Sequence, residues 1–334
     1  MEVRERIWCS NSRPYIRLLP DGLKVKPGGR SKRLQRVLTD FGCERSFVKA
    51  AGSVLEHYGF QINPAAVRLT TLTHARRAQE RLEADYEEPY RQLPENGAQH
   101  IIAEVDGTMI CTVSPGPRKR LRPREWKEMR LAAARNKDQA ETVYAAAFAE
   151  VDRIGRLWGH CAKQAGRGVN SRIHAVGDGA EWIQAQTREV FGSAGNFLCD
   201  FFHVSEYLAK AAPACRATRP DSWRRIQQGR LKRGQPRRVI AELKPHLEPA
   251  TTSEEQAPVQ NAHRYLSNRI DCLDYPGALE LGLPIGSGMI ESGHKHVLHA
   301  RLKITGAAWL AGNANTLAHL RVLRANRKWE KIWN

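Results

Sequence analysis

The sequence predicts an α/β protein: a mixed sheet with helices on its faces, interrupted by an all-helical insertion and preceded by a small helical N-terminal domain. Three observations predict this class. Apolar residues recur at helical spacing over residues 31–88, and from residue 100 strand-like runs alternate with helical patterns. A basic, helix-like stretch at 216–283 then interrupts the alternation, which resumes at 284. The length of 334 residues fits more than one domain.

The first 88 residues divide into a basic segment and a helical domain. Residues 1–30 are rich in turn formers, and we expect them to be partly ordered. Over 31–88 the pattern predicts three helices: one from Ser31 to a stop at Gly42, one over Ser46–Tyr58 ended by Gly59, and one from Asn63-Pro64 towards Glu83.

These three helices match the outline of a helix-turn-helix DNA-binding domain. The third helix would then enter the DNA groove and present Arg68, Arg76 and Arg77. The alternative is a small helical bundle whose charged face is only solvated. Acidic residues followed by Pro89, Pro94 and Gly97 mark a linker, so a second domain is predicted to begin near His100.

Two β-like runs open the second domain, His100–Val105 and Thr108–Val113, separated by Asp106-Gly107. An Asp-Gly pair between apolar runs predicts a hairpin turn, with glycine supplying the positive φ. The pattern then predicts a third strand over Trp126–Ala134 and one long helix over Thr142–Ala165.

Strand and helix alternate once more before the insertion. We expect a strand over Ser171–Gly177 that ends at Asp178, a helix over 180–191, a strand over Asn196–Phe202 and a helix over 204–215. An antiparallel meander followed by helix, strand, helix and strand builds a mixed sheet covered by helices. The mixed-sheet domain would thus comprise 100–215 and 284–334, with the insertion at 216–283.

The charge indicates a polyanionic partner. The sequence has 53 Lys and Arg against 35 Asp and Glu, a net charge of +18. Nucleic acid fits better than a membrane surface, because no long Lys-rich amphipathic helix stands out. Seven cations cluster in the insertion and could contact phosphates, although such a run is usually a solvated face: Arg224, Arg225, Arg230, Lys232, Arg233, Arg237 and Arg238.

Other features suggest a cytoplasmic protein. The sequence shows no signal-peptide pattern and no apolar run long enough to span a membrane. Its seven cysteines are scattered without a Cys-x-x-Cys pair, which indicates reduced thiols and argues against a zinc ribbon.

Three carboxylates stand at positions where they could meet. Asp106 and Asp178 each follow a predicted strand, and Glu291 lies one turn into a helix that begins at the candidate N-cap Ser287. Hard divalent cations prefer such oxygen ligands. Taken singly, Asp106 and Asp178 could be turn residues, and Glu291 could pair with Lys295 on the helix surface.

The motifs around these acids resemble those of DDE transposases of bacterial insertion sequences, in particular the ISKra-type family related to Mutator-like elements. The resemblance rests on Val105-Asp-Gly107, Gly177-Asp-Gly-Ala180, Cys199-Asp-Phe-Phe-His-Val204, Gly286-Ser-Gly-Met-Ile-Glu-Ser292 and Arg301-Leu-Lys-Ile-Thr-Gly-Ala-Ala-Trp309. It covers about residues 100–330 in the same order. Family members often carry a longer N-terminal part with paired cysteines, which this sequence lacks.

The resemblance implies an RNase H-like catalytic core in which Asp106, Asp178 and Glu291 hold two Mg²⁺ or Mn²⁺ ions for DNA strand cleavage and strand transfer. It also implies double-stranded DNA, both transposon ends and target, as partner, a homodimer or larger assembly on DNA, and a bacterial, nucleoid-associated location. Asp200 and His203 match the family's Asp-x-x-His signature, whose role is less settled. The tail and last helices would add Lys295, Arg301, Lys303 and Trp309 to the DNA contacts.

Alternatives remain open for both residues and function. Asp200 could cap the following helix, His203 could be a packing histidine, and Trp309 could belong to the core. The same core could serve a nuclease that does not transpose. A catalytically inactive DNA-binding transposase remnant is the third possibility, suggested by the absent cysteine pairs.

Overall fold

The computed structural model describes residues 8–10, 13–16, 29–116 and 123–333. The chain divides into two compact units. The sheet unit comprises Glu88–Met109 and Glu128–Lys295, and the terminal unit comprises Met1–Glu87, Ile110–Lys127 and His296–Asn334. Among the described residues, no helix is both long and apolar enough to cross a membrane.

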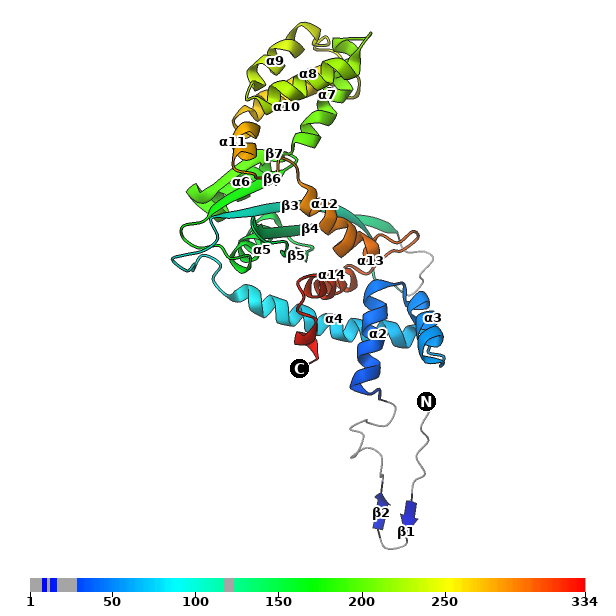
Figure 1. Ribbon diagram of the computed structural model, residues 1–334. Helices are drawn as coiled ribbons and strands as arrows, with labels where there is room; N and C mark the ends of the chain where they lie inside the picture. Colours follow the sequence, from blue (N-terminus) through cyan, green and yellow to red (C-terminus); the bar gives the residue numbers. More distant parts are fainter. Residues whose placement is uncertain (1–7, 11–12, 17–28, 117–122, 334) are drawn as a thin grey trace. The chain divides into compact units, whose positions relative to one another are not determined.

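A five-stranded mixed sheet forms the centre of the sheet unit (Figure 1). Its strands, in the order in which they neighbour one another, are β5 (Thr142–Ala147), β4 (Arg124–Asn136), β3 (His100–Val113), β6 (Arg172–Gly177) and β7 (Gly195–Cys199). β4 and β5 pair antiparallel, whereas β6 pairs parallel with both β3 and β7. The predicted mixed α/β class is therefore confirmed.

Helices bury the apolar residues of this sheet. α5 (Val151–Gln164) packs beside β5 and against α6 (Glu181–Phe191), and its side chains at helical spacing, Ile154, Leu157 and Trp158, are almost fully buried. Burying one such side chain contributes about 2 kcal/mol through the hydrophobic effect. Gly155 has no side chain where the Gln186 amide approaches, which lets α5 and α6 lie close together.

The predicted hairpin at Asp106-Gly107 is wrong, because β3 is one strand that continues through both residues. The glycine serves a different need: a Cβ at Gly107 would lie 2.2 Å from Oε1 of Glu128. Gly107 therefore gives the neighbouring strand's side chain room to approach, which is a common reason for glycine inside a strand. The strand ends at Val113.

The single long helix predicted over Thr142–Ala165 is also wrong. Its first part is the strand β5, in which Ala147 pairs with Arg130 of β4 and Thr142 pairs with Arg135 of β4. Thr142, Val143 and Tyr144 favour a strand, and pairing with β4 outweighs the helical spacing of the alanines that follow. The helix begins only at Val151.

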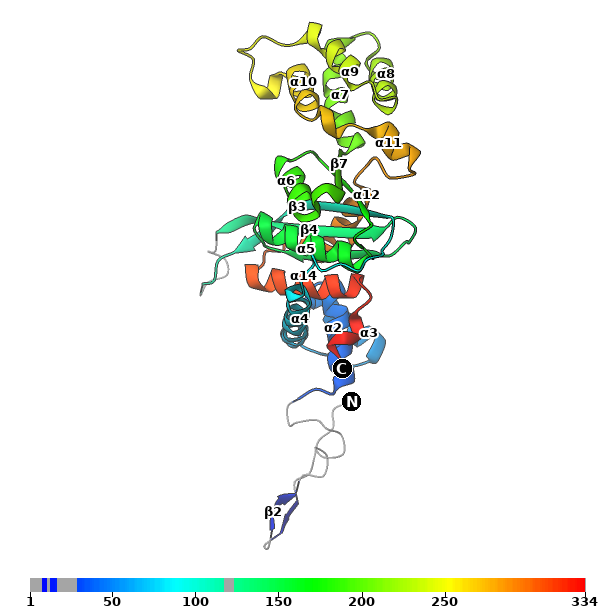
Figure 2. The same ribbon diagram turned by 90° about the vertical axis from the view of Figure 1, so that its left-hand side faces the viewer.

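The chain between β7 and the last helix of the sheet unit is helical. α7 (Phe201–Cys215) starts earlier than expected, directly after β7, because Asp200 caps it. α8 (Pro220–Lys232), α9 (Pro236–Leu243) and α10 (Pro258–Asn268) gather around the end of α7, as both views show (Figures 1 and 2). α11 (Tyr275–Glu280) and α12 (Gly288–Gly293) follow, and a π-helix begins at His294.

The described part of the terminal unit contains the helices α2 (Lys32–Glu44), α3 (Phe47–Tyr58), α4 (Pro64–Glu87) and α14 (Ala311–Ala325). The three predicted helix starts are confirmed, with Ser31 and Ser46 accepting hydrogen bonds from Leu34 N and Lys49 N. Gly59 ends α3 with a φ of 71°. Short elements complete the unit: β1 (Trp8–Ser10), paired antiparallel with β2 (Arg13–Ile16), α13 (Ala300–Leu302) and the 3₁₀ turn Trp329–Ile332.

Most of the segment 1–30, predicted to be partly ordered, lies outside the described residues. The predicted domain boundaries also stay a prediction. They divide the chain into an N-terminal segment, a domain at 31–88, a catalytic domain and an insertion at 216–283.

Candidate functional site

Three aspartates stand in line across neighbouring parallel strands, with Asp106 inside β3 and with Asp178 and Asp200 directly after β6 and β7. Glu104 pairs with Val176, so the same register carried two residues further brings Asp106 beside Asp178. Gly177 pairs with Cys199, and the next residues are Asp178 and Asp200. Neighbouring strands lie about 4.8 Å apart, so the register alone gathers these acids at one edge of the sheet.

A cavity of about 630 Å³ opens at this edge. Its wall contains the predicted triad and both residues of the Asp-x-x-His signature: Asp106, Asp178, Glu291, Asp200 and His203. It also contains Phe202, Glu206 and the backbone of the Gly286-Ser287-Gly288 loop. Residues that are far apart in the sequence thus reach one cavity, which is what a site for oxygen-liganded cations and phosphate requires.

Asp106 is partly accessible from this cavity, with 36% of its side chain exposed. Oδ1 accepts a hydrogen bond of 2.7 Å from the backbone N–H of Gly107, and Oδ2 lies 3.4 Å from Nε2 of His294. The His294 side chain is only 4% exposed and comes from the turn after α12. A protonated His294 would stabilise the charge on Asp106, and a neutral one could donate a hydrogen bond to it.

Asp178 is held by the loop after β6. Oδ1 accepts a hydrogen bond of 2.9 Å from Ala180 N, while its carbonyl oxygen accepts one of 2.5 Å from the Tyr265 hydroxyl. Gly179 adopts a φ of 84°, a left-handed conformation that favours glycine, and its carbonyl accepts a bond from Nε of Arg269. Tyr265 of α10 and Arg269, the residue directly after α10, therefore hold the loop that carries Asp178.

Asp200 uses both carboxylate oxygens within the protein. Oδ1 accepts bonds of 2.6 and 3.3 Å from the N–H groups of Phe202 and His203, which caps α7. Oδ2 accepts bonds of 3.0 Å from Ser287 N and 2.5 Å from Ser287 Oγ. This buried carboxylate thus joins the start of α7 to the loop before α12, and its capping role was one of the predicted alternatives.

His203 lines the cavity and packs against aromatic rings. Its ring centroid lies 5.5 Å from that of Tyr207 and 5.8 Å from that of Tyr265. This placement agrees with a packing histidine while leaving part of its ring at the cavity wall.

Glu291 lies on α12, the helix that Ser287 precedes. Its side chain is exposed and forms part of the cavity wall. Ser287 occupies the N-cap position but makes no side-chain capping bond, because its hydroxyl donates to Asp200. The prediction that the Ser287 side chain caps α12 is therefore wrong. Instead, Oε2 of Glu104 accepts a hydrogen bond of 2.7 Å from Ile290 N.

Sequence reasoning missed Glu104, the one charged residue in the run Ile101–Val105. Its side chain is 1% exposed, and burial raises the pKa of this carboxyl from 4.5 to about 8. Glu104 and Asp106 are two residues apart on one strand, so both point to the same face of the sheet. An acid alternating with the predicted Asp in an apolar run was the signal that could have revealed it.

The fit of the triad to two Mg²⁺ or Mn²⁺ ions depends on the available oxygens. Among the described residues, Asp178 Oδ2 and both Glu291 carboxylate oxygens accept no hydrogen bond from the protein, so oxygen ligands of the right chemistry face one cavity. No three His, Cys, Asp or Glu side chains of the described part are gathered closely enough to hold a metal ion in this conformation. The donor set fits the oxygen preference of hard divalent cations.

The side chains that are predicted to contact DNA differ in their exposure to solvent. Cations with exposed side chains are Arg68, Arg76 and Arg77 on α4, Arg225, Lys232, Arg233, Arg237 and Arg238 around α8 and α9, and Lys295 and Lys303. Two others are partly covered by ion pairs: Arg224 with Asp221 at 3.1 Å and Arg230 with Glu242 at 3.0 Å.

Arg301 and Trp309 do not support the predicted DNA contact, because both are buried, at 2% and 9% exposure. The Arg301 guanidinium lies between the rings of Phe47 and Trp309, 4.6 and 4.8 Å from their centroids, and Nε donates to the Gly42 carbonyl. Burial lowers the pKa of this guanidinium to about 10. The pair belongs to the core of the terminal unit.

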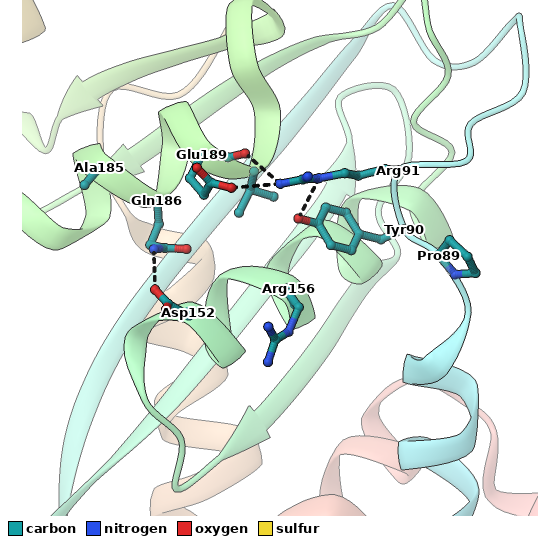
Figure 3. A pocket seen from close by; sticks show the side chains of 9 residues that line it. Pro89, Tyr90, Arg91, Asp152, Arg156, Ala185, Gln186 and Glu189 are labelled. Atoms are coloured by element: carbon teal, nitrogen blue, oxygen red, sulfur yellow. Dashed lines mark hydrogen bonds and ion pairs between the residues drawn. The ribbon is translucent and has the colours of Figure 1, made fainter.

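A second cavity of about 720 Å³ lies where residues 89–91 meet α5 and α6 (Figure 3). Arg91 contacts the Tyr90 hydroxyl and Glu189, Gln186 donates to Asp152, and Arg156 also lines this cavity. The predicted catalytic residues line the carboxylate cavity and not this one, so we regard the carboxylate cavity as the candidate functional site.

Comparison with known proteins places part of the chain near one family. Residues 166–331 match the model of an uncharacterised protein family, UPF0236. The matched region includes Asp178, Asp200, His203 and Glu291 and begins after Asp106. The family description names no function.

Curated relatives come from Caldanaerobacter subterraneus subsp. tengcongensis. The UPF0236 protein TTE0610/TTE0881/TTE1053/TTE2432 is 28% identical over 156 residues, 46% of this chain and 31% of the relative. The UPF0236 protein TTE1650/TTE2708 matches equally, over 30% of its length. A third has the same identity and coverage as the first, and its name joins eleven designations, from TTE0033 to TTE2212. The chain spans about a third of the length of the relatives that it matches.

Proposed function

We propose that this chain is a DDE-type DNA transposase with an RNase H-like catalytic core that cleaves DNA at transposon ends and transfers the strand into target DNA. One observation carries the proposal: the parallel register that brings Asp106 and Asp178 together in a cavity that Glu291 also lines. The order of meander, helix, strand, helix and strand supports an RNase H-like core.

Charge and surface support a DNA partner. The net charge of +18 favours a polyanion, and exposed cations around the α8–α9 turn are suited to phosphate contacts. Because two transposon ends are joined in one reaction, a homodimer or larger assembly on DNA is part of the proposal. The many designations in one relative's name fit a gene present in several copies, as expected of a mobile element.

Each site residue has a task in this proposal. Asp106, Asp178 and Glu291 offer oxygen ligands to two Mg²⁺ or Mn²⁺ ions, which when bound activate water and stabilise the leaving oxygen of the cleaved strand. Asp200 positions the Gly286-Ser287-Gly288 loop. Glu104 positions α12, and with it Glu291, through Ile290 N.

The test uses the full chain and DNA carrying the inverted repeats expected to flank its coding region. We expect nicks at the repeat ends and joined products on plasmid target DNA, both dependent on Mg²⁺. Asp106→Asn, Asp178→Asn and Glu291→Gln should each reduce these products by more than about 100-fold, on the order expected for loss of an essential catalytic group. Glu280→Gln, at an exposed acid on α11, is the matched control and should retain activity.

The outcomes separate the alternatives. Cleavage that never yields joined products would identify a nuclease that does not transpose. Metal-dependent activity that survives all three triad substitutions would refute the assignment of these residues. DNA binding by a wild-type chain that never cleaves would identify an inactive remnant.

A further inference from the structure

Phe202 has an exposed aromatic side chain on the wall of the carboxylate cavity. It is 65% exposed, although its neighbours Phe201 and Val204 are buried beneath the same helix. A single exposed apolar residue is common on protein surfaces. This one stands among Asp106, Asp178 and Glu291, where water would otherwise solvate charged groups.

The ring of Phe202 lies against two neighbours, and a third binds its backbone. One side lies against Gly286, where a Cβ would be 2.6 Å from Cδ2 of the ring. The Phe201 ring meets it edge-on, with centroids 5.8 Å apart and planes at 83°. The Phe202 N–H is bound by Asp200 Oδ1 at 2.6 Å, which fixes the backbone at the start of α7. Because residue 286 is a glycine, the flat Phe202 ring can lie directly against the loop.

The exposed face of this ring can stack with a flat, uncharged group that is part of a polyanion. A nucleobase has that chemistry, because each base carries a π-face and is attached to a phosphate that the carboxylate site would handle. A base inside a duplex has both faces covered by its neighbours, so only an unpaired or flipped base can stack here.

We propose that Phe202 is a stacking platform for one unpaired nucleobase next to the phosphate that reacts in the cavity. The inference rests on the proposed function and adds the state of its substrate: the DNA enters the cavity with at least one base out of the duplex.

Further aromatic rings lie beyond Phe202. His203 contacts Tyr207 and Tyr265, which line a neighbouring cavity of about 610 Å³. These two tyrosine rings stack on each other, with centroids 4.3 Å apart, and acidic as well as basic side chains line that cavity. We therefore place a single base at this wall, on Phe202.

Short oligonucleotides that contain 2-aminopurine test this proposal, because stacking quenches the fluorescence of that base. The probes carry it in a single strand, in an unpaired end of a duplex, or in a fully paired duplex. We expect the full-length chain to quench the first two probes. Phe202→Ala should abolish the quench and weaken binding of the single strand by roughly 5- to 150-fold, the value of one base stacked on an aromatic ring.

Two further variants make the result specific. Phe202→Trp keeps an aromatic surface and should retain both quench and affinity. Trp126→Ala, which removes an equally exposed aromatic ring that does not line this cavity, should leave both unchanged. Circular dichroism confirms that each variant is folded.

The results distinguish this inference from the proposed function. If Phe202→Ala quenches and binds like the wild type while metal-dependent cleavage persists, the stacking role is refuted and the transposase proposal stands. If quenching depends on Phe202 but no cleavage occurs, stacking holds and the catalytic proposal fails. A wild-type chain that binds none of the probes refutes the stacking proposal.

Discussion

The carboxylate of Glu104, buried in β3, accepts a hydrogen bond of 2.7 Å from the backbone N–H of Ile290 at the start of α12. This bond connects the strand that carries Asp106 with the helix that carries Glu291. It also supplies the N-terminal hydrogen bond that Ser287 does not make. A helix of six residues depends on such a contact, because few of its N–H groups find partners within it.

The buried Glu104 should make stability depend on pH. Its pKa is raised in the folded chain to about 8, so the folded state keeps the proton while the unfolded state loses it above about 4.5. The stabilisation is therefore complete below pH 4.5 and is lost as pH rises towards 8. We expect the Glu104→Gln variant to gain stability relative to the wild type across this range, measured by urea unfolding at several pH values. An identical pH dependence for both proteins would contradict the raised pKa.

Replacing Asp200 should loosen two elements at once. Asp200→Ala removes the cap of α7 and the bonds to Ser287, and we expect a loss of about 2 to 4 kcal/mol in the free energy of unfolding. Asp200→Asn keeps an oxygen for the cap and should lose less. Ser287→Ala removes only the hydroxyl and should cost about 1 kcal/mol. Equal losses for Asp200→Ala and Ser287→Ala would show that the cap contributes nothing.

Arg301 should act on stability and not on DNA affinity. Arg301→Ala empties a buried site between Phe47 and Trp309, and we expect a loss of about 2 to 4 kcal/mol, measured by thermal unfolding. Lys303→Ala, at an exposed cation two residues away, should change stability by less than about 0.5 kcal/mol. A stable Arg301→Ala variant with weakened DNA binding would instead support the DNA contact that the sequence predicts.

Exposed cations around the α8–α9 turn should govern the salt dependence of DNA binding. The combined Arg233→Ala, Arg237→Ala and Arg238→Ala variant should lower the slope of log K against log salt by about one for each phosphate that these side chains neutralise. Arg224→Ala is the control, because Arg224 already pairs with Asp221. Fluorescence anisotropy with duplex DNA at several salt concentrations measures the slope, and an unchanged slope would exclude this turn from the interface.

The sequence was informative where the decisive signals are local. Ser31, Ser46 and Asn63-Pro64 each begin a helix of the terminal unit, because a cap acts within one helical turn. Asp178 could be assigned to a strand end because a buried apolar run precedes it, whereas the same assignment is wrong for Asp106, which lies inside β3.

Features that depend on a neighbouring element were missed. Gly107 resembles a turn glycine until Glu128 of β4 is seen to occupy the space beside it. Thr142–Ala147 is a strand because β4 offers it hydrogen bonds, and no local pattern reveals that partner. Burial of Arg301 likewise comes from distant parts of the chain, so an arginine among aromatic rings could not be predicted.

The strand register determines which insertions and deletions in the chain this site can tolerate. Asp106 and Asp178 stay side by side only while β3 and β6 keep their pairing of Glu104 with Val176. Because side chains alternate between the two faces of a strand, deleting one residue within either strand would turn one of the two acids to the opposite face. Residues added to the connections outside the strands leave the pairing intact. We therefore expect homologues and engineered variants to vary the spacing between these acids freely in their loops, and to keep it fixed from Ile101 to Asp106 and from Ile173 to Asp178.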